Sequence, residues 1–219
     1  MPGILIAFEG IDASGKSTQA KLLAEALRAK GRAVVLTKEP FLELPTFAGI
    51  IAGAGSVKTH KDADTLDEIG GYKLAPETDV FLFAADRAEH VHKVIKPALE
   101  AGKIVITDRY YPSSVAYQSV FGKLDEKWIG EVNRFAPRPD AIVLLDLDAE
   151  KAAERTAGGA ERRLARFEVL EKQKLLRQKY LEMAERGEWI VVDALQPAET
   201  VAKQVLAALE SKLGANFKA

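Results

Sequence analysis

The sequence contains no cysteine, so disulfide bonds and thiolate metal sites are excluded. It also lacks an excess of either charge, with 31 Lys and Arg against 32 Asp and Glu and a net charge of −1. This balance argues against a nucleic-acid partner held by a general basic field. No apolar stretch approaches the roughly 20 residues that a membrane-spanning helix needs, so we expect no membrane partner either.

The beginning of the sequence does not resemble a secretory signal, because a basic segment is missing and Glu9 interrupts the first apolar run. Together with the absence of cysteine, this favours a cytoplasmic protein. The 219 residues, 47% of them apolar and 29% charged, suit one globular domain. We therefore expect a single domain over 1–219.

The most informative segment is Gly10–Ser17, which fits the pattern G-x-x-x-x-G-K-[ST]. An apolar run at 4–8 precedes it, and a helical pattern at 16–30 follows, with Gly31 as its stop. Strand, glycine loop and helix in this order form a phosphate cradle, the P-loop, in which backbone N–H groups and the positive helix end face a polyphosphate. The lysine reaches the outer phosphates, and the serine hydroxyl can hold Mg²⁺. The residues predicted to bind a nucleoside triphosphate are Gly10, Ile11, Asp12, Ala13, Ser14, Gly15, Lys16, Ser17 and Thr18.

Four further apolar, β-branched runs follow, at 33–37, 103–107, 141–145 and 189–192. They are continuous rather than alternating, which is typical of strands covered on both faces of a parallel sheet. Helical patterns lie between them, including a long one at about 168–186 and a last one opened by Pro197. The sequence therefore predicts an α/β fold, a five-stranded parallel sheet with helices on both faces and ligands at the carboxyl ends of the strands.

Two segments break this regular pattern. Residues 41–73 form an irregular insert rich in Gly, Thr and charge, and residues 156–166 carry two glycines followed by three arginines. Loops this long in a compact domain are usually lids, binding loops or disordered segments. Residues 156–166 are therefore a candidate for a mobile lid, a binding loop or a disordered segment.

The run at 103–107 leads into Asp108-Arg109-Tyr110. An acidic residue at the carboxyl end of a strand beside the P-loop strand is the usual second partner of Mg²⁺, directly or through water. The arginine beside it can neutralise phosphate charge. Ser17 and Asp108 are therefore the predicted magnesium ligands.

The sequence resembles the thymidylate kinases over nearly its whole length. The matching motifs are Phe8-Glu9-Gly10-Ile11-Asp12 with Gly15–Gln19, Leu82–His90, Asp108-Arg109-Tyr110 with Ser113–Gln118, Arg166-Phe167-Glu168, and Tyr180-Leu181 with Ala184. A P-loop alone is shared by many activities, but Phe-x-x-x-Arg, Asp-Arg-Tyr and Ala-Tyr-Gln in this order are far more discriminating. The resemblance implies a P-loop kinase fold with a mobile lid, a homodimer, and Mg²⁺-assisted transfer of the ATP γ-phosphoryl group to dTMP. The products would be dTDP and ADP, in a step of dTTP synthesis.

The resemblance also implies which residues contact the nucleoside. Phe83 would stack on thymine while Arg87 hydrogen-bonds its carbonyl, as positions four apart lie on one helical face. Ser113 and Gln118 would read the polar edge of the base. Tyr117 would lie against the sugar and disfavour a 2′-hydroxyl.

The remaining acceptor contacts implied by the resemblance are Asp12 at the 3′-hydroxyl and Arg109 at the phosphate. After the second strand the family usually has Arg-Glu-Pro, whereas this sequence has Lys38-Glu39-Pro40. The arginine normally grips the acceptor phosphate with two hydrogen bonds, which a lysine cannot do. At the lid, Ala165 stands where an aspartate commonly precedes the arginine. The sequence therefore leaves open how strictly the protein selects dTMP over dUMP or other acceptors.

Phosphoryl transfer needs little covalent chemistry from the protein, so positioning and charge neutralisation should dominate. The resemblance implies a basic residue either in the P-loop or in the lid. This P-loop has none at Ala13 or Ser14, while Arg155 and three further arginines crowd the lid. We therefore expect the lid to supply a catalytic guanidinium. The predicted catalytic residues are Lys16, Arg109, Arg163 and Arg166.

Other functions remain open at this point. A kinase of dUMP or another deoxynucleoside monophosphate, or a deoxynucleoside kinase, is the nearest alternative. A P-loop ATPase or nucleotide-binding regulator belongs to a different class, and its ATP turnover would ignore every nucleoside monophosphate. A structural protein with a vestigial site is disfavoured because Lys16, Ser17 and Asp108 are all present.

Overall fold

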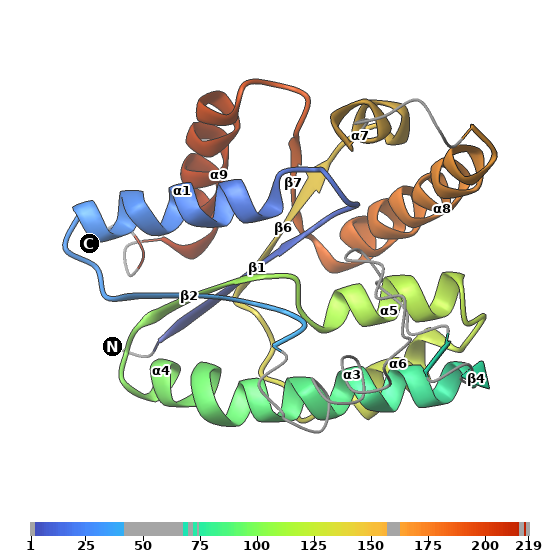
Figure 1. Cartoon of the computed structure of the whole chain (residues 1–219). Coiled ribbons are helices and arrows are strands. Elements are labelled where there is room, and N and C mark those ends of the chain that lie inside the picture. Colours follow the sequence, from blue (N-terminus) through green and yellow to red (C-terminus); the bar gives the residue numbers. More distant parts are fainter. Residues whose placement is uncertain are drawn as a thin grey trace.

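The computed structural model describes residues 3–41, 68–69, 72–73, 75–156, 163–214 and 217. A five-stranded sheet forms its centre, with the order β2-β5-β1-β6-β7 and every neighbouring pair parallel (Figure 1). Its strands are β1 (Ile4–Glu9), β2 (Val34–Lys38), β5 (Ile104–Asp108), β6 (Ala141–Asp146) and β7 (Ile190–Asp193). The predicted five-stranded parallel sheet is confirmed.

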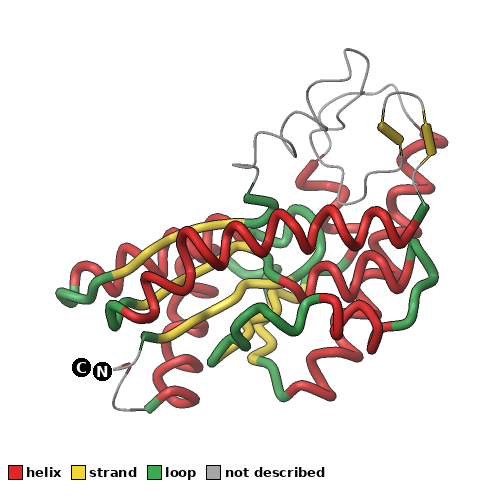
Figure 2. The backbone as a smooth tube through the Cα atoms, turned by 90° about the horizontal axis from the view of Figure 1, so that it is seen from below, coloured by secondary structure: helices red, strands yellow, loops and turns green. Residues whose placement is uncertain are grey.

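Two helical layers cover the sheet. Their members are α1 (Lys16–Ala29), α3 (Pro76–His90), α4 (Lys96–Glu100), α5 (Tyr111–Val120), α6 (Glu126–Val132), α7 (Ala149–Thr156), α8 (Arg163–Gly187) and α9 (Ala198–Leu213), with the π-helix η1 (Val91–Ile95) between α3 and α4. Helices α1 and α9 lie on one side of the sheet, and α3 and α4 lie on the other (Figure 1). In the view from below, helices lie in front of the strands (Figure 2). Within the described residues, no helix has the length and apolarity needed to cross a membrane.

Strand β1 supplies both hydrophobic cores. Ile6 and Phe8 pack in the core that contains α1 and α9, whereas Leu5 and Ala7 pack in the core that contains η1 and α4. This division follows from the two-residue period of a strand, which sends successive side chains to opposite faces. The central strand is thereby fixed from both sides, and its carboxyl end becomes a rigid base for the P-loop.

The expectation that all strands are covered on both faces holds for the centre of the sheet and is wrong for its edges. Leu36 in β2 is 38% exposed and Val191 in β7 is 49% exposed. An edge strand has a neighbour on one side only, so its side chains receive less cover. A continuous apolar run therefore does not distinguish an edge strand from a central one.

The predicted start of the long helix needs a correction. Helix α8 begins at Arg163 rather than at about residue 168, so residues 163–166 of the segment expected as a lid are helical. Residues 163–168 are Arg-Leu-Ala-Arg-Phe-Glu, mostly strong helix formers, which extend the helix toward its amino end. Residues 157–162 lie outside the described residues. So does the insert expected at 41–73, apart from Phe41 and the antiparallel pair β3 (Glu68–Ile69) and β4 (Tyr72–Lys73).

Candidate active site

Two glycines give the P-loop its shape. Gly10 has φ +142°, and a Cβ atom there would lie 2.7 Å from the Leu145 carbonyl oxygen, so the backbone passes too close to β6 for any side chain. Gly15 has φ +96° and directly precedes the first residue of α1. The loop thus places the amino end of α1, whose first N–H groups have no acceptor within the helix, at the carboxyl end of β1.

Lys16 is held inside this loop. Its side chain is buried, and Nζ donates a hydrogen bond to the Ile11 carbonyl oxygen at 2.8 Å. A buried ammonium must keep polar partners, and phosphate oxygens would be stronger ones than a carbonyl. The role of Lys16 at the outer phosphates stays a prediction.

Ser17 and Asp108 meet across the P-loop and the end of β5. The Ser17 hydroxyl donates a hydrogen bond to Asp108 Oδ2. The other carboxylate oxygen, Asp108 Oδ1, is buried and has no hydrogen-bond partner among the described residues. A hydroxyl beside an unpartnered carboxylate oxygen fits the oxygen ligands that Mg²⁺ prefers. The described residues contain no cluster of three or more His, Asp or Glu that could hold a metal, so other ligands would come from phosphate or water.

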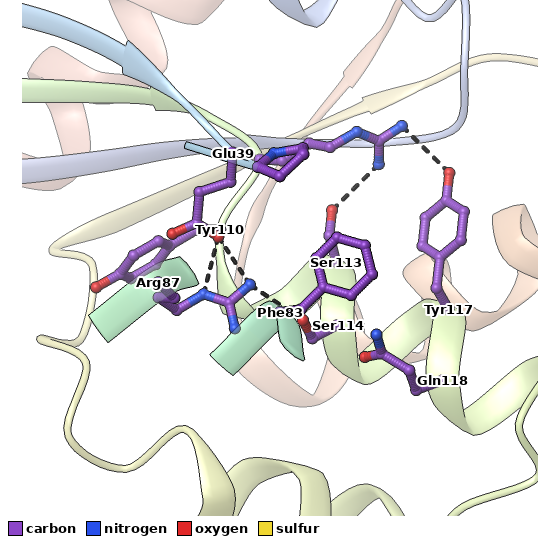
Figure 3. A pocket seen from close by; sticks show the side chains of 10 residues that line it. Glu39, Phe83, Arg87, Tyr110, Ser113, Ser114, Tyr117 and Gln118 are labelled. Atoms are coloured by element: carbon purple, nitrogen blue, oxygen red, sulfur yellow. Dashed lines mark hydrogen bonds and ion pairs between the residues drawn. The ribbon is translucent and has the colours of Figure 1, made fainter. Parts of the chain in front are cut away.

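A pocket opens next to the P-loop, between α3 and α5 (Figure 3). The lining residues that were predicted as site residues are Phe83, Arg87, Arg109, Ser113, Tyr117 and Gln118. Four further lining residues were not predicted as such: Glu39, Pro40, Tyr110 and Ser114. Helical spacing brings these side chains together, because residues four apart on α3 and on α5 share one face. Asp12 and Lys38 are not among the residues that line it.

Arg109 joins the P-loop to this pocket. Its guanidinium pairs with the Asp12 carboxylate, donates from Nη1 to Ser113 Oγ at 3.1 Å, and donates from Nη2 to the Tyr117 hydroxyl at 3.2 Å. The residue has φ +68°, an unfavourable value for arginine. Such conformations persist where the surroundings hold them, and they cluster at functional sites.

Glu9 lies beneath this arginine and was missed as a site residue. It is fully buried, with Oε1 accepting from the Tyr110 N–H at 2.9 Å and Oε2 accepting from Ser113 Oγ at 2.7 Å. Burial raises the pKa of the Glu9 carboxyl to about 7, although the Ser113 hydrogen bond and the nearby charge of Arg109 oppose the rise. The sequence did contain an indication of this role, because an acidic residue in an otherwise apolar strand is unusual.

Arg87 is not a solvated helix charge. It is 2% exposed, and it forms an ion pair with Glu39, with 2.8 Å from Nε and 2.7 Å from Nη2 to Oε2. Nη2 also donates to Ser114 Oγ at 3.0 Å, and Nη1 donates to Asn133. These partners fix the plane of the guanidinium at the pocket wall (Figure 3).

Lys38 and Arg155 do not line this pocket. Lys38 is exposed at the carboxyl end of β2, opposite Asp108 in register. Arg163 and Arg166 belong to α8, and their side chains lie outside the described residues. Arg155 donates to the carbonyl oxygens of Ala13 and Ala194 at 3.1 and 2.7 Å, so it ties the P-loop to the loop after β7.

Comparison with known proteins adds to this geometry. The family model described as thymidylate kinase matches residues 8–43 and 59–205. A probable thymidylate kinase of Thermococcus onnurineus is 44% identical over 216 residues, with 96% of this chain and 98% of the relative covered. One of Thermococcus kodakarensis is 45% identical over 213 residues, with 96% and 99% covered. The thymidylate kinase of Leifsonia xyli subsp. xyli is 39% identical over 220 residues, with 97% of each chain covered.

Proposed function

The chain belongs to the thymidylate kinase family, and we propose that it transfers the γ-phosphoryl group of ATP to dTMP, giving dTDP and ADP. It is an ATP-dependent phosphotransferase with a P-loop. We further propose that it acts in the cytoplasm as a homodimer, with no nucleic-acid or membrane partner.

The observation that carries the acceptor assignment is the pocket between α3 and α5. The half-buried ring of Phe83, the fixed donors of Arg87 and the amide of Gln118 meet there, which suits a flat base with polar edges. Arg109 lines the same pocket and touches Asp12 of the P-loop, so an acceptor phosphate would enter beside the donor phosphates. This arrangement favours a nucleotide acceptor over a plain ATPase.

The chain's own residues would position and neutralise charge during transfer. Lys16 would bind the outer phosphates of ATP, and Arg109 would bind the acceptor phosphate. Asp12 would accept a hydrogen bond from the 3′-hydroxyl of the sugar. A bound Mg²⁺, held by Ser17 and Asp108, would supply charge neutralisation at the phosphates. Arg163 and Arg166, from the proposed lid, would also neutralise charge at the phosphates.

The test is an assay of ADP release with Mg²⁺ across dTMP, dUMP, dCMP, thymidine and no acceptor. We expect the highest kcat/KM with dTMP and no reaction with thymidine, because thymidine lacks the phosphate that Arg109 would bind. Protein carrying Lys16→Ala, prepared in the same way, controls for contaminating enzymes. ATP turnover that ignores every monophosphate would indicate a P-loop ATPase, and preference for thymidine would indicate a nucleoside kinase.

A further inference from the structure

Gln118 and Asp79 form a buried pair at the wall of the acceptor pocket. Gln118 lies on α5 and is 2% exposed, while Asp79 lies in the first turn of α3 and is 6% exposed. Gln118 Nε2 donates a hydrogen bond to Asp79 Oδ2 at 3.1 Å. Of the two, Gln118 lines the acceptor pocket.

The pair determines which way the Gln118 amide is turned. A carboxylate accepts hydrogen bonds but donates none, so the NH₂ end of the amide must face Asp79. The other end, Gln118 Oε1, is buried and has no hydrogen-bond partner among the described residues. Figure 3 shows this oxygen on the side of Phe83 and Ser114, within the pocket. A buried acceptor without a partner is costly, and a ligand that brings a donor removes the cost.

We propose that Asp79 sets the base selectivity of the acceptor pocket by holding Gln118 with its carbonyl oxygen toward the base. The inference rests on the proposed function, because it concerns the same acceptor. Thymine and uracil carry an N–H at ring position 3, which can donate to this oxygen. Cytosine has an unprotonated nitrogen there, and two acceptors would face each other. Asp79 does not touch the base and is a positioning residue.

The test replaces the carboxylate by a group of the same shape in Asp79→Asn. An asparagine amide both donates and accepts, so Gln118 is free to turn its NH₂ end into the pocket. We expect the ratio of kcat/KM for dTMP to kcat/KM for dCMP to fall about tenfold, with the KM for ATP within about twofold of wild type. Glu77→Gln, at an exposed position in the same helical turn, is the matched control and should keep the ratio.

A double-mutant cycle with Gln118→Leu separates positioning from a structural role. Leucine cannot present either end of an amide, so Asp79→Asn should leave the ratio unchanged in that background. An equal change in both backgrounds would overturn the proposal, as would a folded Asp79→Asn protein with the wild-type ratio. Asp79→Ser, whose hydroxyl also donates and accepts, serves if Asp79→Asn does not fold. Wild-type protein inactive on dTMP would instead refute the proposed function.

Discussion

The guanidinium of Arg109 forms an ion pair with the carboxylate of Asp12, so the end of β5 is tied to the P-loop. Helix α8 contacts both partners, because Gln173 Nε2 lies 3.3 Å from Asp12 Oδ2 and the Tyr180 hydroxyl lies 3.4 Å from Arg109 Nη1. If Arg109 binds the acceptor phosphate, as we propose, the phosphate must share or displace these partners. Acceptor binding would then be linked to helix α8.

Arg109→Lys should weaken use of the acceptor. Nη1 of the guanidinium donates to Ser113, and Nη2 donates to Asp12 and Tyr117. The single ammonium of a lysine cannot make all of these hydrogen bonds. Losing one to two such bonds, at about 1–3 kcal/mol each, should lower kcat/KM for dTMP about tenfold or more. Steady-state kinetics with each substrate varied would measure this.

The control for this variant is Arg186→Lys on α8, where the side chain is 61% exposed and pairs with Glu126. This variant should keep kcat/KM for both substrates within about twofold of wild type, because an exposed ion pair contributes little to stability. If Arg109→Lys raised the KM for ATP as much as that for dTMP, the assignment of Arg109 to the acceptor would be wrong.

Lys16→Ala should abolish transfer and spare the fold. It removes the buried ammonium that we assign to the outer phosphates, and loss of such a charge commonly lowers kcat by about 10²-fold or more. Turnover and the thermal midpoint are to be measured together. Lys21→Ala, on the same helix but exposed, should match wild type in both. Near-normal turnover of Lys16→Ala would remove this residue from the mechanism.

Glu9 should make stability fall as the pH rises. Burial raises its pKa from 4.5 to about 7, so the folded protein holds a proton that the unfolded chain has lost between these values. The stabilisation is complete below pH 4.5 and disappears as the pH passes 7. A shift of this size corresponds to about 3 kcal/mol over the window.

Glu9→Gln copies the protonated carboxyl and removes this titration. The difference in unfolding free energy, variant minus wild type, should therefore increase from pH 4.5 to pH 8, as measured by urea unfolding at several pH values. Glu185→Gln, at an exposed position, is the matched control. A flat difference for Glu9→Gln would contradict the raised pKa.

Much of this site could be predicted from the sequence, because short-range patterns encode it. The P-loop motif places Lys16 and Ser17 through local geometry, and the four-residue spacing of Phe83 and Arg87 places both on one face of α3. The order of the β-rich runs gave the strands, and Asp108 was expected beside the P-loop because parallel strands end at a common edge.

The residues that were missed depend on contacts between distant segments. Glu39 follows an edge strand and pairs with Arg87 48 positions later. Asn133, directly after α6, contacts the same guanidinium. Asp79 contacts Gln118 only because α3 packs beside α5. The hydrophobic periodicity of a sequence does not predict such contacts, since tertiary packing decides which residues of distant elements meet. The start of α8 was predicted too late in the sequence for a local reason. The two glycines at 158–159 indicated a loop, although the residues from Arg163 onward favour a helix.

Tyr117→Ala should relax the preference for deoxyribose. The Tyr117 ring is buried at the pocket wall, and its hydroxyl bonds to Arg109 at 3.2 Å. Removing the ring opens space for a 2′-hydroxyl, so kcat/KM for the ribonucleotide should rise relative to dTMP. Tyr117→Phe keeps the ring and should keep the ratio, while weakening dTMP use through the lost bond to Arg109. A fixed ratio in Tyr117→Ala would mean that another group excludes the ribonucleotide.

Lys38→Arg should strengthen acceptor binding. Lys38 ends β2 in register with Asp108, and the next two residues, Glu39 and Pro40, line the acceptor pocket. Its side chain is exposed, so a longer guanidinium has room to reach an entering phosphate. The planar fork matches two phosphate oxygens, whereas an ammonium acts as a point charge. One additional hydrogen bond should lower the KM for dTMP about threefold, with the KM for ATP unchanged.

Lys38→Ala tells whether this position is used at all. If Lys38 holds the acceptor phosphate, the alanine variant should raise the KM for dTMP while the arginine variant lowers it. If both variants leave the KM unchanged, another cation grips the phosphate. Lys58 and Lys61 of the insert, outside the described residues, are then the next positions to replace. Because dTMP and thymidine differ only in the phosphate, a Lys38 effect confined to dTMP binding would locate its action there.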